Sequence, residues 1–281
     1  MTIEMLRAAG GPVWVLGLGR SGQAAIRLLR LHGCPVRAAD AADTPALRAA
    51  AEAWRAEGIP VRLGAAPVEP EGAGAAVISP GIAPDGAWVA PLVRAGVPLI
   101  GELELGWSAL RAPVLAITGS SGKSTLVKLC AEALIRAGLR AVAAGNYGAP
   151  LSEIAGGGET WDWVVAETSS FQLETARIFR PRIGLLLNLH PNHLDRHRTM
   201  AAYRAAKLRM FQNQESDEVA VVPVEFAAPA ALPGAGRRVT FGAEAVADWR
   251  YEAGRVCGAG VRIDLRGTPF DNPVLGVAAA A

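Results

Sequence analysis

Short apolar runs alternate with helix-like segments along almost the whole chain. The first runs cover residues 12–19, 35–40 and 75–81, and segment 22–33 repeats apolar residues at helical spacing. Apolar runs of about four to eight residues are typical of strands buried on both faces, and intervening helices connect such strands in parallel. The pattern therefore predicts an α/β fold that begins with a Rossmann-like parallel sheet with right-handed crossovers.

The same alternation starts again near residue 113 and predicts a second α/β domain. Its apolar runs are "PVLAIT", "RAVAAGN", "DWVVAE", "RIGLLLNL" and "EVAVVPV". A hinge is expected at Gly101–Pro113. We therefore divide the chain into a Rossmann-like domain, residues 1–105, and a central P-loop-type α/β domain, residues 106–267.

The last segment, residues 268–281, has the pattern of a helix start. Asn272 suits the N-cap of that helix and Pro273 its first turn. The apolar helix that follows stops after about two turns, at Ala281. We therefore expect residues 268–281 to be the start of a truncated third domain.

Composition and charge limit the class of protein. The 281 residues carry a formal net charge of +2, which gives no electrostatic reason to expect nucleic acid or a membrane as a partner. The apolar runs are too short to cross a bilayer, and the N-terminus lacks the apolar core of a signal peptide. The three cysteines are scattered without a CxxC spacing, which favours a reducing compartment. We expect a cytoplasmic monomer.

The string "TGSSGKST" connects an expected strand to an expected helix. Glycines let backbone N–H groups converge on an anion, a lysine reaches the outer phosphates, and a hydroxyl ligates Mg²⁺. The strict phosphate-loop motif requires glycine where this chain has Ile117. A strand–helix junction that binds nothing is the plainer alternative. We favour a nucleotide-binding loop formed by Gly119, Ser120, Ser121, Gly122, Lys123, Ser124 and Thr125.

The string "GLGRSG", residues 17–22, has the GxGxxG spacing of dinucleotide-binding loops. It follows an expected strand and opens an expected helix, and Asp40 lies at the end of the next strand. This arrangement fits a pyrophosphate at a helix N-terminus with a carboxylate near a ribose. A nicotinamide or flavin nucleotide, a UDP-sugar, and a tight turn without a ligand are all compatible with it.

Polar side chains follow several expected strands of the second domain. Glu167 and Ser169 follow one strand, Asn146 another and His193 a third, whereas Lys207 lies on an expected helix. Taken singly, each is more simply a solvated residue, a structural histidine or a surface ion-pair partner. Because the carboxyl ends of parallel strands meet at one edge of a sheet, together they indicate a polar site beside the phosphate loop. A carboxylate in that place suits Mg²⁺.

Seven strings occur in the order in which the Mur ligases carry them, and the chain resembles that family. They are "VWVLGLGRSG", "VISPGI", "AITGSSGKST", "GNYGAPL", "ETSSFQLE", "LLNLHPNHLDRH" and "YRAAKLRMF". Within the family, "SSFQLE" and "HLDRH" are similar to the member that adds D-glutamate to UDP-N-acetylmuramoyl-L-alanine. The resemblance implies an ATP-dependent, amide-bond-forming ligase of peptidoglycan precursor synthesis, and therefore of cell-wall growth, cell shape and cell division.

The resemblance also implies a role for each matching residue. Two Mg²⁺ ions would be held by Ser124, Glu167, His193 and Lys207, with Lys207 carbamylated by CO₂. ATP would lie on the Gly119–Thr125 loop, with Asn272 near its adenine. The uridine nucleotide of the substrate would lie against Gly17, Gly19, Arg20, Ser21, Asp40, Ser79 and Gly81, while substrate or metal would also approach Asn146 and Ser169. Catalysis would depend on Lys123, Lys207 and His193.

The implied reaction joins a carboxylate to an amine through an acyl phosphate formed with ATP. The chain departs from the family at Ser121, where asparagine is usual, at Asn192, where aspartate is usual, and in residues 267–272. The family's third domain has no counterpart here, so we expect nucleotide binding to survive and ligation to be severely impaired. The alternatives are a non-catalytic nucleotide- or UDP-sugar-binding remnant or sensor, and a nicotinamide oxidoreductase that uses "GLGRSG".

Overall fold

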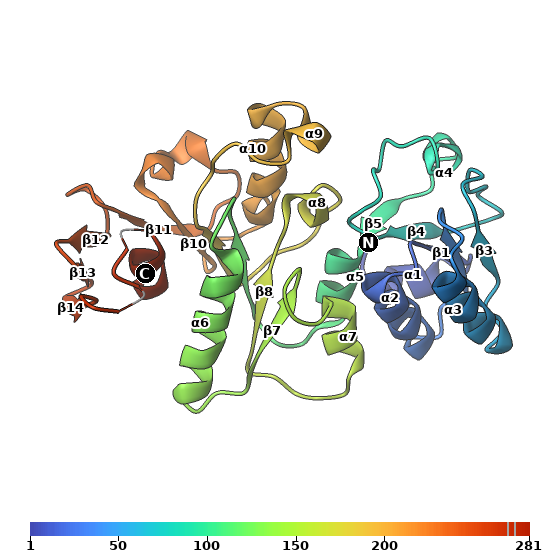
Figure 1. The fold of residues 1–281 in the computed structure, drawn as a ribbon, viewed down its shortest axis with the longest axis horizontal. Coiled ribbons are helices and arrows are strands. Elements are labelled where there is room, and N and C mark those ends of the chain that lie inside the picture. Colours follow the sequence, from blue (N-terminus) through green and yellow to red (C-terminus); the bar gives the residue numbers. More distant parts are fainter. Residues whose placement is uncertain (269, 273) are drawn as a thin grey trace. The chain divides into compact units, whose positions relative to one another are not determined.

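The computed structural model describes residues 1–268, 270–272 and 274–281, and within them the chain forms two compact units, each built around its own sheet (Figure 1). Strands and helices alternate in both units, which confirms the predicted α/β fold. The first unit contains Met1–Arg111, Ala149–Glu159 and Thr175–Phe179, and the second contains Ala112–Gly148, Thr160–Glu174 and Arg180–Ala281.

Over the described residues, the first unit has a five-stranded sheet in the order β3-β2-β1-β4-β5. All of its neighbouring strands pair in parallel. The strand order reverses between β1 and β4, and in such sheets ligands bind at the carboxyl ends of the strands beside this point. The strands are β1 (Val13–Leu16), β2 (Val36–Asp40), β3 (Val61–Leu63), β4 (Ala75–Ile78) and β5 (Leu99–Gly101).

Helices cover this first sheet and bury an apolar core against it. Ile26 and Leu29 of α2 pack in one cluster with Val13 and Val15 of β1, and all four side chains are fully buried. This agrees with the helical spacing of apolar residues in segment 22–33. The helices are α1 (Ile3–Ala8), α2 (Arg20–Leu31), α3 (Pro45–Ala56), α4 (Ala90–Arg94), α5 (Glu102–Ala109) and α7 (Leu151–Gly156).

The segment Gly101–Pro113 was expected to be a hinge, but it contains the continuous helix α5. The first compact unit therefore runs to Arg111, and a boundary at 105/106 would cut that helix. Two buried carboxylates of α5 bind backbone N–H groups of later segments. Glu102 accepts from Ser152 at 2.7 Å, and Glu104 accepts from three successive N–H groups, those of Arg177, Ile178 and Phe179. These bonds explain why residues 149–159 and 175–179 pack with the first unit.

In the described part of the second unit, nine strands form a sheet in the order β14-β13-β12-β11-β10-β9-β6-β8-β7. Neighbouring strands from β7 to β12 in this order pair in parallel, which was predicted for β6 to β10, whereas the sequence analysis named no run for β11 or β12. The strands are β6 (Val114–Thr118), β7 (Ala141–Gly145), β8 (Trp163–Glu167), β9 (Ile183–Leu186), β10 (Val219–Pro223), β11 (Arg237–Gly242), β12 (Trp249–Glu252), β13 (Arg255–Gly258) and β14 (Val261–Asp264).

The strands β12, β13 and β14 pair antiparallel, which the sequence analysis did not predict. Each of their two hairpin loops is an Ala-Gly pair, Ala253-Gly254 and Ala259-Gly260, with positive φ at both residues. Two-residue loops of this conformation match the twist of antiparallel strands. Such turns are normally identified in a sequence by an Asn-Gly or Asp-Gly pair. Alanine rarely adopts positive φ, so an Ala-Gly pair does not predict this turn.

The helices of the second unit are α6 (Lys123–Arg136), α8 (Ser170–Leu173), α9 (Leu194–His197), α10 (Met200–Leu208) and α11 (Leu275–Ala280), with 3₁₀ turns at Arg209–Phe211, Val224–Phe226 and Pro229–Ala231. Asn272 was predicted as the N-cap, but the N-cap residue of α11 is Val274; Asn272 Oδ1 instead accepts from the backbone N–H groups of Val274 and Leu275 at the start of the helix. Pro273 lies outside the described residues. Val277 and Ala278 are buried in the core of the second unit, so α11 packs there. Whether residues 268–281 begin a third domain stays a prediction.

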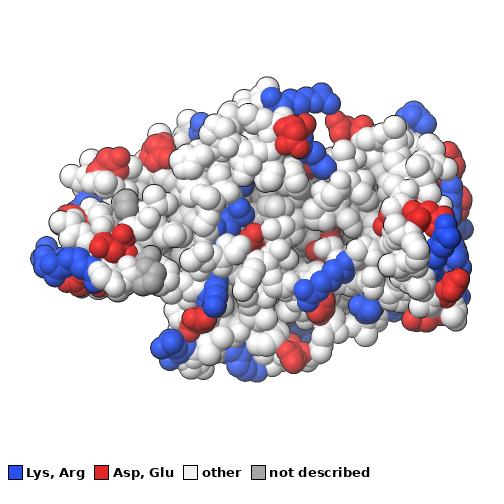
Figure 2. All heavy atoms as spheres, viewed as in Figure 1, with Lys and Arg blue, Asp and Glu red and all other residues white. Residues whose placement is uncertain are grey.

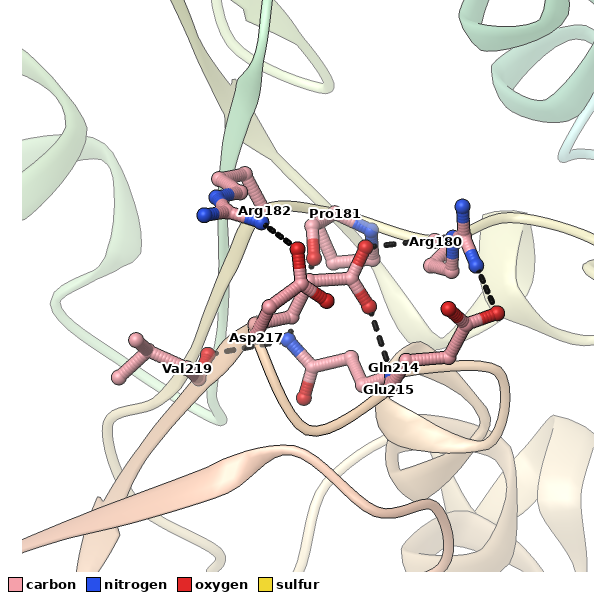
Figure 3. A network of polar contacts seen from close by, with 8 residues as sticks. Arg180, Pro181, Arg182, Gln214, Glu215, Asp217 and Val219 are labelled. Atoms are coloured by element: carbon pink, nitrogen blue, oxygen red, sulfur yellow. Dashed lines mark hydrogen bonds and ion pairs between the residues drawn. The ribbon is translucent and has the colours of Figure 1, made fainter.

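Polar contacts fix the loop that enters β10 at the amino ends of β9 and β10 (Figure 3). The buried amide of Gln214 donates to the carbonyl oxygens of Pro181, at 3.1 Å, and Val219, at 3.0 Å. Around it, ion pairs join Arg180 to Glu215 and Glu218, and Arg182 to Asp217. The network therefore lies at the edge of the sheet opposite the carboxyl ends of the strands.

Basic and acidic side chains are interspersed on the face drawn in Figure 2 without a large area of one sign. This distribution agrees with the small formal net charge of +2. Among the helices that the structure describes, none is both long and apolar enough to cross a membrane.

Candidate functional site

In the first unit, a cavity of about 350 Å³ lies at the carboxyl ends of β1, β2 and β4. Its lining includes all seven residues that the sequence analysis placed there: Gly17, Gly19, Arg20, Ser21, Asp40, Ser79 and Gly81. Ile82, the last residue of the string "VISPGI", also lines it, as do Ala41 and Trp88, to which no motif pointed. The cavity lies at the point where the strand order reverses, as expected for a ligand site in this kind of sheet.

The glycine-rich loop of this cavity is held by contacts that explain its sequence. A methyl group on Gly22 would lie 1.8 Å from the carbonyl oxygen of Gly17, so only glycine lets α2 begin so close to the loop. The carboxylate of Asp40 accepts from the backbone N–H groups of Leu18, at 2.7 Å, and Ala42, at 2.9 Å. Asp40 therefore fixes the loop against β2, and its approach to a ribose stays a prediction.

In the second unit, the phosphate loop connects β6 to α6 as the sequence predicts. Gly122 precedes α6 with φ of 78°, a left-handed conformation that favours glycine. A methyl group there would come within 3.0 Å of Leu187 Cδ2 and 3.1 Å of Leu275 Cδ2. Leu275 begins α11, so the loop is packed against the helix to which Asn272 is hydrogen-bonded. This contact brings the region of Asn272 to the phosphate loop.

A buried carboxylate connects three neighbouring strand ends beside this loop. Glu167, at the end of β8 and 3% exposed, accepts from Ser124 Oγ at 2.6 Å and from Asn146 Nδ2 at 2.7 Å. Ser124 lies on the first turn of α6 and Asn146 follows β7. The strand ends therefore bring Glu167, Ser124 and Asn146 together, as the sequence analysis expected.

Hydroxyl and carboxylate oxygens are the donors that Mg²⁺ prefers, and Mg²⁺ in nucleotide sites usually keeps several water and phosphate ligands. Ser124 and Glu167 fit such a site, because their oxygens already lie within 2.6 Å of each other. Among the described residues, no group of three or more His, Cys, Asp or Glu side chains lies close enough to form a protein-only metal site. The donor set therefore fits an ion that is shared with a bound phosphate.

Two lysines lie beside the same carboxylate. Lys207 is 2% exposed and donates to the carbonyl oxygen of Gly119 at 2.9 Å and to Thr118 Oγ1 at 3.3 Å. Burial and, to a smaller extent, the neighbouring Lys123 lower the pKa of Lys207 to about 7, while Glu167 opposes the shift. Burial also lowers the pKa of Lys123, which donates to the carbonyl oxygen of Ser120. Lys207 is thus no surface ion-pair partner.

Asn188, one of the polar residues that the sequence places just after an expected strand, and Tyr203, which had no predicted role, hold the loop. Asn188 Oδ1 accepts from the backbone N–H groups of Ser120, at 2.9 Å, and Ser121, at 3.1 Å. The Tyr203 hydroxyl lies 3.0 Å from Ser120 Oγ, which also bonds the backbone of His190. The strand position of Asn188 was a usable signal, whereas the burial of Tyr203 depends on tertiary packing.

Three predicted residues occupy less direct positions. Ser169 uses its hydroxyl to cap α8, where it accepts from the N–H of Gln172. Thr125 is exposed on the first turn of α6. His193 has a left-handed backbone, with φ of 53°, and its ring lies 4.8 Å from that of Phe171. Among the described residues, His193 makes no hydrogen bond to Glu167, so its role as a metal ligand stays a prediction.

A parallel sheet with a phosphate loop, a hydroxyl on the following helix turn and a carboxylate on the adjacent strand define an α/β protein of the P-loop nucleotide-binding class. Residues 117–272 match the Mur ligase middle domain. The chain belongs to the Mur ligase family, and the resemblance seen in the sequence is confirmed.

Curated relatives share its sequence over most of its length. The UDP-N-acetylmuramoylalanine–D-glutamate ligase of Pelotomaculum thermopropionicum is 42% identical over 232 residues, which cover 82% of this chain and 51% of the relative. The protein of the same name from Desulfotalea psychrophila is 39% identical over 252 residues, with 85% and 53% covered. The chain thus spans about half the length of these relatives.

Solved structures of the family have the same fold. UDP-N-acetylmuramate:L-alanyl-gamma-D-glutamyl-meso-diaminopimelate ligase from Neisseria meningitides aligns with a TM-score of 0.58 at 18% identity, over 96% of this chain and 91% of that one. MurF from Acinetobacter baumannii aligns with a TM-score of 0.54 at 16% identity, over 99% and 63%. At such low identity these structures support the fold alone.

Proposed function

We propose that this chain carries the nucleotide- and substrate-binding parts of an ATP-dependent ligase that adds D-glutamate to UDP-N-acetylmuramoyl-L-alanine. The observation that carries the proposal is the buried Glu167 between Ser124 and Asn146, beside a phosphate loop with two lysines whose pKa values are lowered by burial. Relatives named for that reaction match most of the chain, which supports the choice of substrates. Family membership also favours this activity over that of a nicotinamide oxidoreductase.

The proposed ATP site is the loop of residues 119–125 at the start of α6. Its backbone N–H groups and the positive end of the helix dipole would bind the phosphates. Lys123 would neutralise charge on the outer phosphates, and Asn272 would approach the adenine, because the helix to which it is hydrogen-bonded packs on Gly122. Ser124 and Glu167, with His193, would hold Mg²⁺ ions, which neutralise charge on the transferred phosphoryl group.

Lys207 is the proposed site of carbamylation. Its low pKa supplies a neutral amine near neutral pH, whereas an exposed lysine is almost fully protonated there. The neutral nitrogen would attack the carbon of CO₂, form an N–C bond and release a proton to give a carbamate. That change would replace a buried cation next to Lys123 with an anion, which would be favourable beside a cationic lysine and a metal.

The proposed reaction has two displacements. A carboxylate oxygen of the UDP-substrate would attack the γ-phosphorus of ATP, and ADP would leave. The amine of D-glutamate would then attack the carbonyl carbon of the acyl phosphate, lose a proton, and displace inorganic phosphate. The chain's own contribution would be orientation and charge neutralisation by the loop and Lys123, since phosphoryl transfer needs little covalent help.

The uridine nucleotide of the substrate is proposed to bind in the 350 Å³ cavity of the first unit. Its pyrophosphate would face the start of α2 at Gly19, where a methyl group would meet nothing within 4 Å. That open space is the room a ligand needs. Asn146 and Ser169 are proposed to contact substrate in the second unit. A cytoplasmic location and a monomeric state stay predictions from the sequence.

The test measures inorganic phosphate release with MgATP, UDP-N-acetylmuramoyl-L-alanine and D-glutamate, and binding of each nucleotide by calorimetry. We expect both nucleotides to bind, and phosphate release to depend on D-glutamate in a protein of the relatives' full length. Binding of both nucleotides without turnover in a protein of the relatives' full length would favour a non-catalytic sensor. Failure of both nucleotides to bind would overturn the proposal.

A further inference from the structure

Next to the phosphate loop, three side chains form a line of polar contacts that the proposed reaction does not use. His197 Nε2 lies 2.9 Å from Ser170 Oγ, and His197 Nδ1 lies 3.3 Å from Glu174 Oε1. Ser170 begins α8, Glu174 follows that helix, and His197 ends α9. Ser170 is 2% exposed and His197 is 7% exposed. The order of groups is that of a serine–histidine–acid relay.

The partners determine which nitrogen of His197 carries the proton. The Glu174 carboxylate faces Nδ1 at 3.3 Å and can only accept, so it favours a proton on Nδ1, and Nε2 of the neutral ring is then left to accept from the Ser170 hydroxyl. Arg196 occupies the other oxygen of Glu174 at 2.6 Å, which keeps that carboxylate in place. Burial lowers the pKa of His197, which favours the neutral ring. The geometry therefore selects the Nδ1–H tautomer.

Ser170 belongs to the packed interior of this line. It is 2% exposed, and its hydroxyl lies 2.9 Å from His197 Nε2 at the first turn of α8. In the Nδ1–H tautomer of His197, that hydroxyl donates inward, to the ring. The line therefore has a positioning role.

The ring of His197 transmits that position to the phosphate loop. It stacks on Phe171 at 5.5 Å between ring centroids and lies 5.3 Å from the ring of Tyr203. The Tyr203 hydroxyl contacts Ser120 Oγ at 3.0 Å, and Lys207 Nζ lies 4.8 Å from the Tyr203 ring. One buried imidazole thus contacts the aromatic side chain that touches both the loop and Lys207.

The helices around His197 need such a link. Both α8 and α9 have four residues, a length that does not form a stable helix without tertiary contacts. Positive φ at both ends of α9, at His193 and Arg198, adds a backbone conformation that is unfavourable outside glycine. A side chain that joins α9 to α8 and to α10 holds both short helices in one arrangement.

We propose that His197 is a positioning residue of the phosphate loop, acting as the Nδ1–H tautomer between Ser170 and Glu174 and through the ring of Tyr203. The inference rests on the proposed function only in taking this loop as the nucleotide site. Beyond that function, the contacts of His197 would keep residues 119–122 ordered before a nucleotide binds.

The first readout is the tautomer, observed by ¹⁵N NMR of the histidine side chains in the full chain. The sequence has four histidines, so His197 is assigned by its loss in His197→Phe. We expect the Nδ1–H form for His197, and in Ser170→Ala a changed Nε2 shift with Nδ1 still protonated. The Nε2–H form in the unmodified chain would overturn the proposal, and this result needs no nucleotide.

The second readout is amide hydrogen exchange at Ser120 and Ser121. His197→Phe keeps a ring for stacking and removes the hydrogen bond to Ser170 and the polar contact with Glu174, and we expect exchange at these amides to become about tenfold faster or more. If His197→Phe does not fold, Ser170→Ala replaces it, because it removes only a hydroxyl. We expect faster exchange at the same two amides in that variant. His32→Phe, in the first unit, is the matched control and leaves both amides unchanged.

Unchanged exchange at both amides in a folded His197→Phe protein would overturn the positioning role. Nucleotide binding distinguishes this failure from failure of the proposed function. If the unmodified chain binds no MgATP, the proposed function fails, while the tautomer and the exchange rates still decide the role of His197.

Discussion

At the scale of single residues, the carboxylate of Glu167 organises the second site. It is buried, yet each of its oxygens accepts one hydrogen bond, from Ser124 and from Asn146. A buried carboxylate needs such partners, because an unpartnered charge in the interior is strongly unfavourable. The same oxygens can coordinate a cation that a bound triphosphate brings to the loop.

Glu167→Gln tests this role. The substitution keeps the size of the side chain and removes the charge. We therefore expect the factor by which Mg²⁺ increases nucleotide affinity to be at least about ten times smaller than in the unmodified chain. Calorimetric titrations of ADP with and without Mg²⁺ measure the difference. Glu153→Gln, which changes a partly exposed carboxylate of the first unit, should leave the Mg²⁺ effect intact. An unaltered Mg²⁺ effect in Glu167→Gln would rule out the assigned ligand.

Lys207 gives a prediction about pH. Its pKa of about 7 lies well below the ordinary value, so its neutral, CO₂-reactive form grows as the pH rises through 7 and dominates above it. At fixed dissolved ¹³CO₂, we expect a carbamate signal that increases from about pH 6 to about pH 8 and is absent in Lys207→Arg. A signal that survives in Lys207→Arg, or none at about pH 8, would remove the carbamate from the account.

Residue motifs made much of this site predictable, because the carboxyl ends of parallel strands gather whatever polar residues follow them. Glu167, Asn146 and the loop were found in this way. Tyr203 and His197 were not, because their roles depend on which side chains are buried against each other. Helical spacing places Lys207 on a helix but does not reveal that it is buried.

At the scale of elements, α6 connects the phosphate loop to the core of the second unit. Leu126 and Val127 are buried against the sheet, which fixes the direction of the helix and of the N–H groups at its start. Glycines with positive φ flank it, Gly122 before the first turn and Gly138 after the last. The two glycines have different surroundings. Substituting each of them therefore separates the cost of backbone strain from the cost of packing.

We predict that Gly122→Ala is more destabilising than Gly138→Ala. Both substitutions force alanine into a left-handed conformation, which costs about 1 kcal/mol. At Gly138 the added methyl group meets nothing within 4 Å, whereas at Gly122 it presses on Leu187 and Leu275. Urea unfolding of the two variants measures the difference. Equal losses of unfolding free energy in the two variants would show that Leu187 and Leu275 move aside without loss of stability, and would contradict the prediction.

Elements were predictable where apolar runs alternate with helical spacing, and this covers β1, β2 and β4 of the first sheet and β6 to β10 of the second. The helix α5 was taken for a hinge because its hydrophobic residues surround buried Glu102 and Glu104, which blurs helical amphipathicity. The antiparallel strands β12 to β14 were not foreseen, because their Ala-Gly turns carry no strong turn signal.

At the scale of the whole molecule, the chain does not divide into its two units at a single point. Residues 149–159 and 175–179 pack with the first unit although the chain on either side of them belongs to the second. In the first unit, backbone N–H groups of these segments donate hydrogen bonds to the buried carboxylates of Glu102 and Glu104. Burial raises the pKa of Glu102 to about 7, although its bond from Ser152 opposes the shift.

We therefore predict that a fragment of residues 1–111 does not fold independently. It would lack α7 and leave both carboxylates without their backbone donors, and each unsatisfied buried group costs about 1–3 kcal/mol. Thermal unfolding followed by circular dichroism should give a cooperative transition for the whole chain and none for the fragment. A cooperative transition in the fragment near that of the whole chain would contradict the assigned packing.

The central claim is that one chain holds two nucleotide sites, one in each unit. The most direct test is calorimetric titration of MgADP and of UDP-N-acetylmuramoyl-L-alanine into the unmodified chain, Lys123→Ala and Gly19→Leu. We predict that Lys123→Ala weakens MgADP at least about tenfold, that Gly19→Leu does the same to the UDP-substrate by filling its cavity, and that each leaves the other ligand within about twofold. Loss of both ligands in either folded variant, or binding of neither ligand to the unmodified chain, would contradict the account.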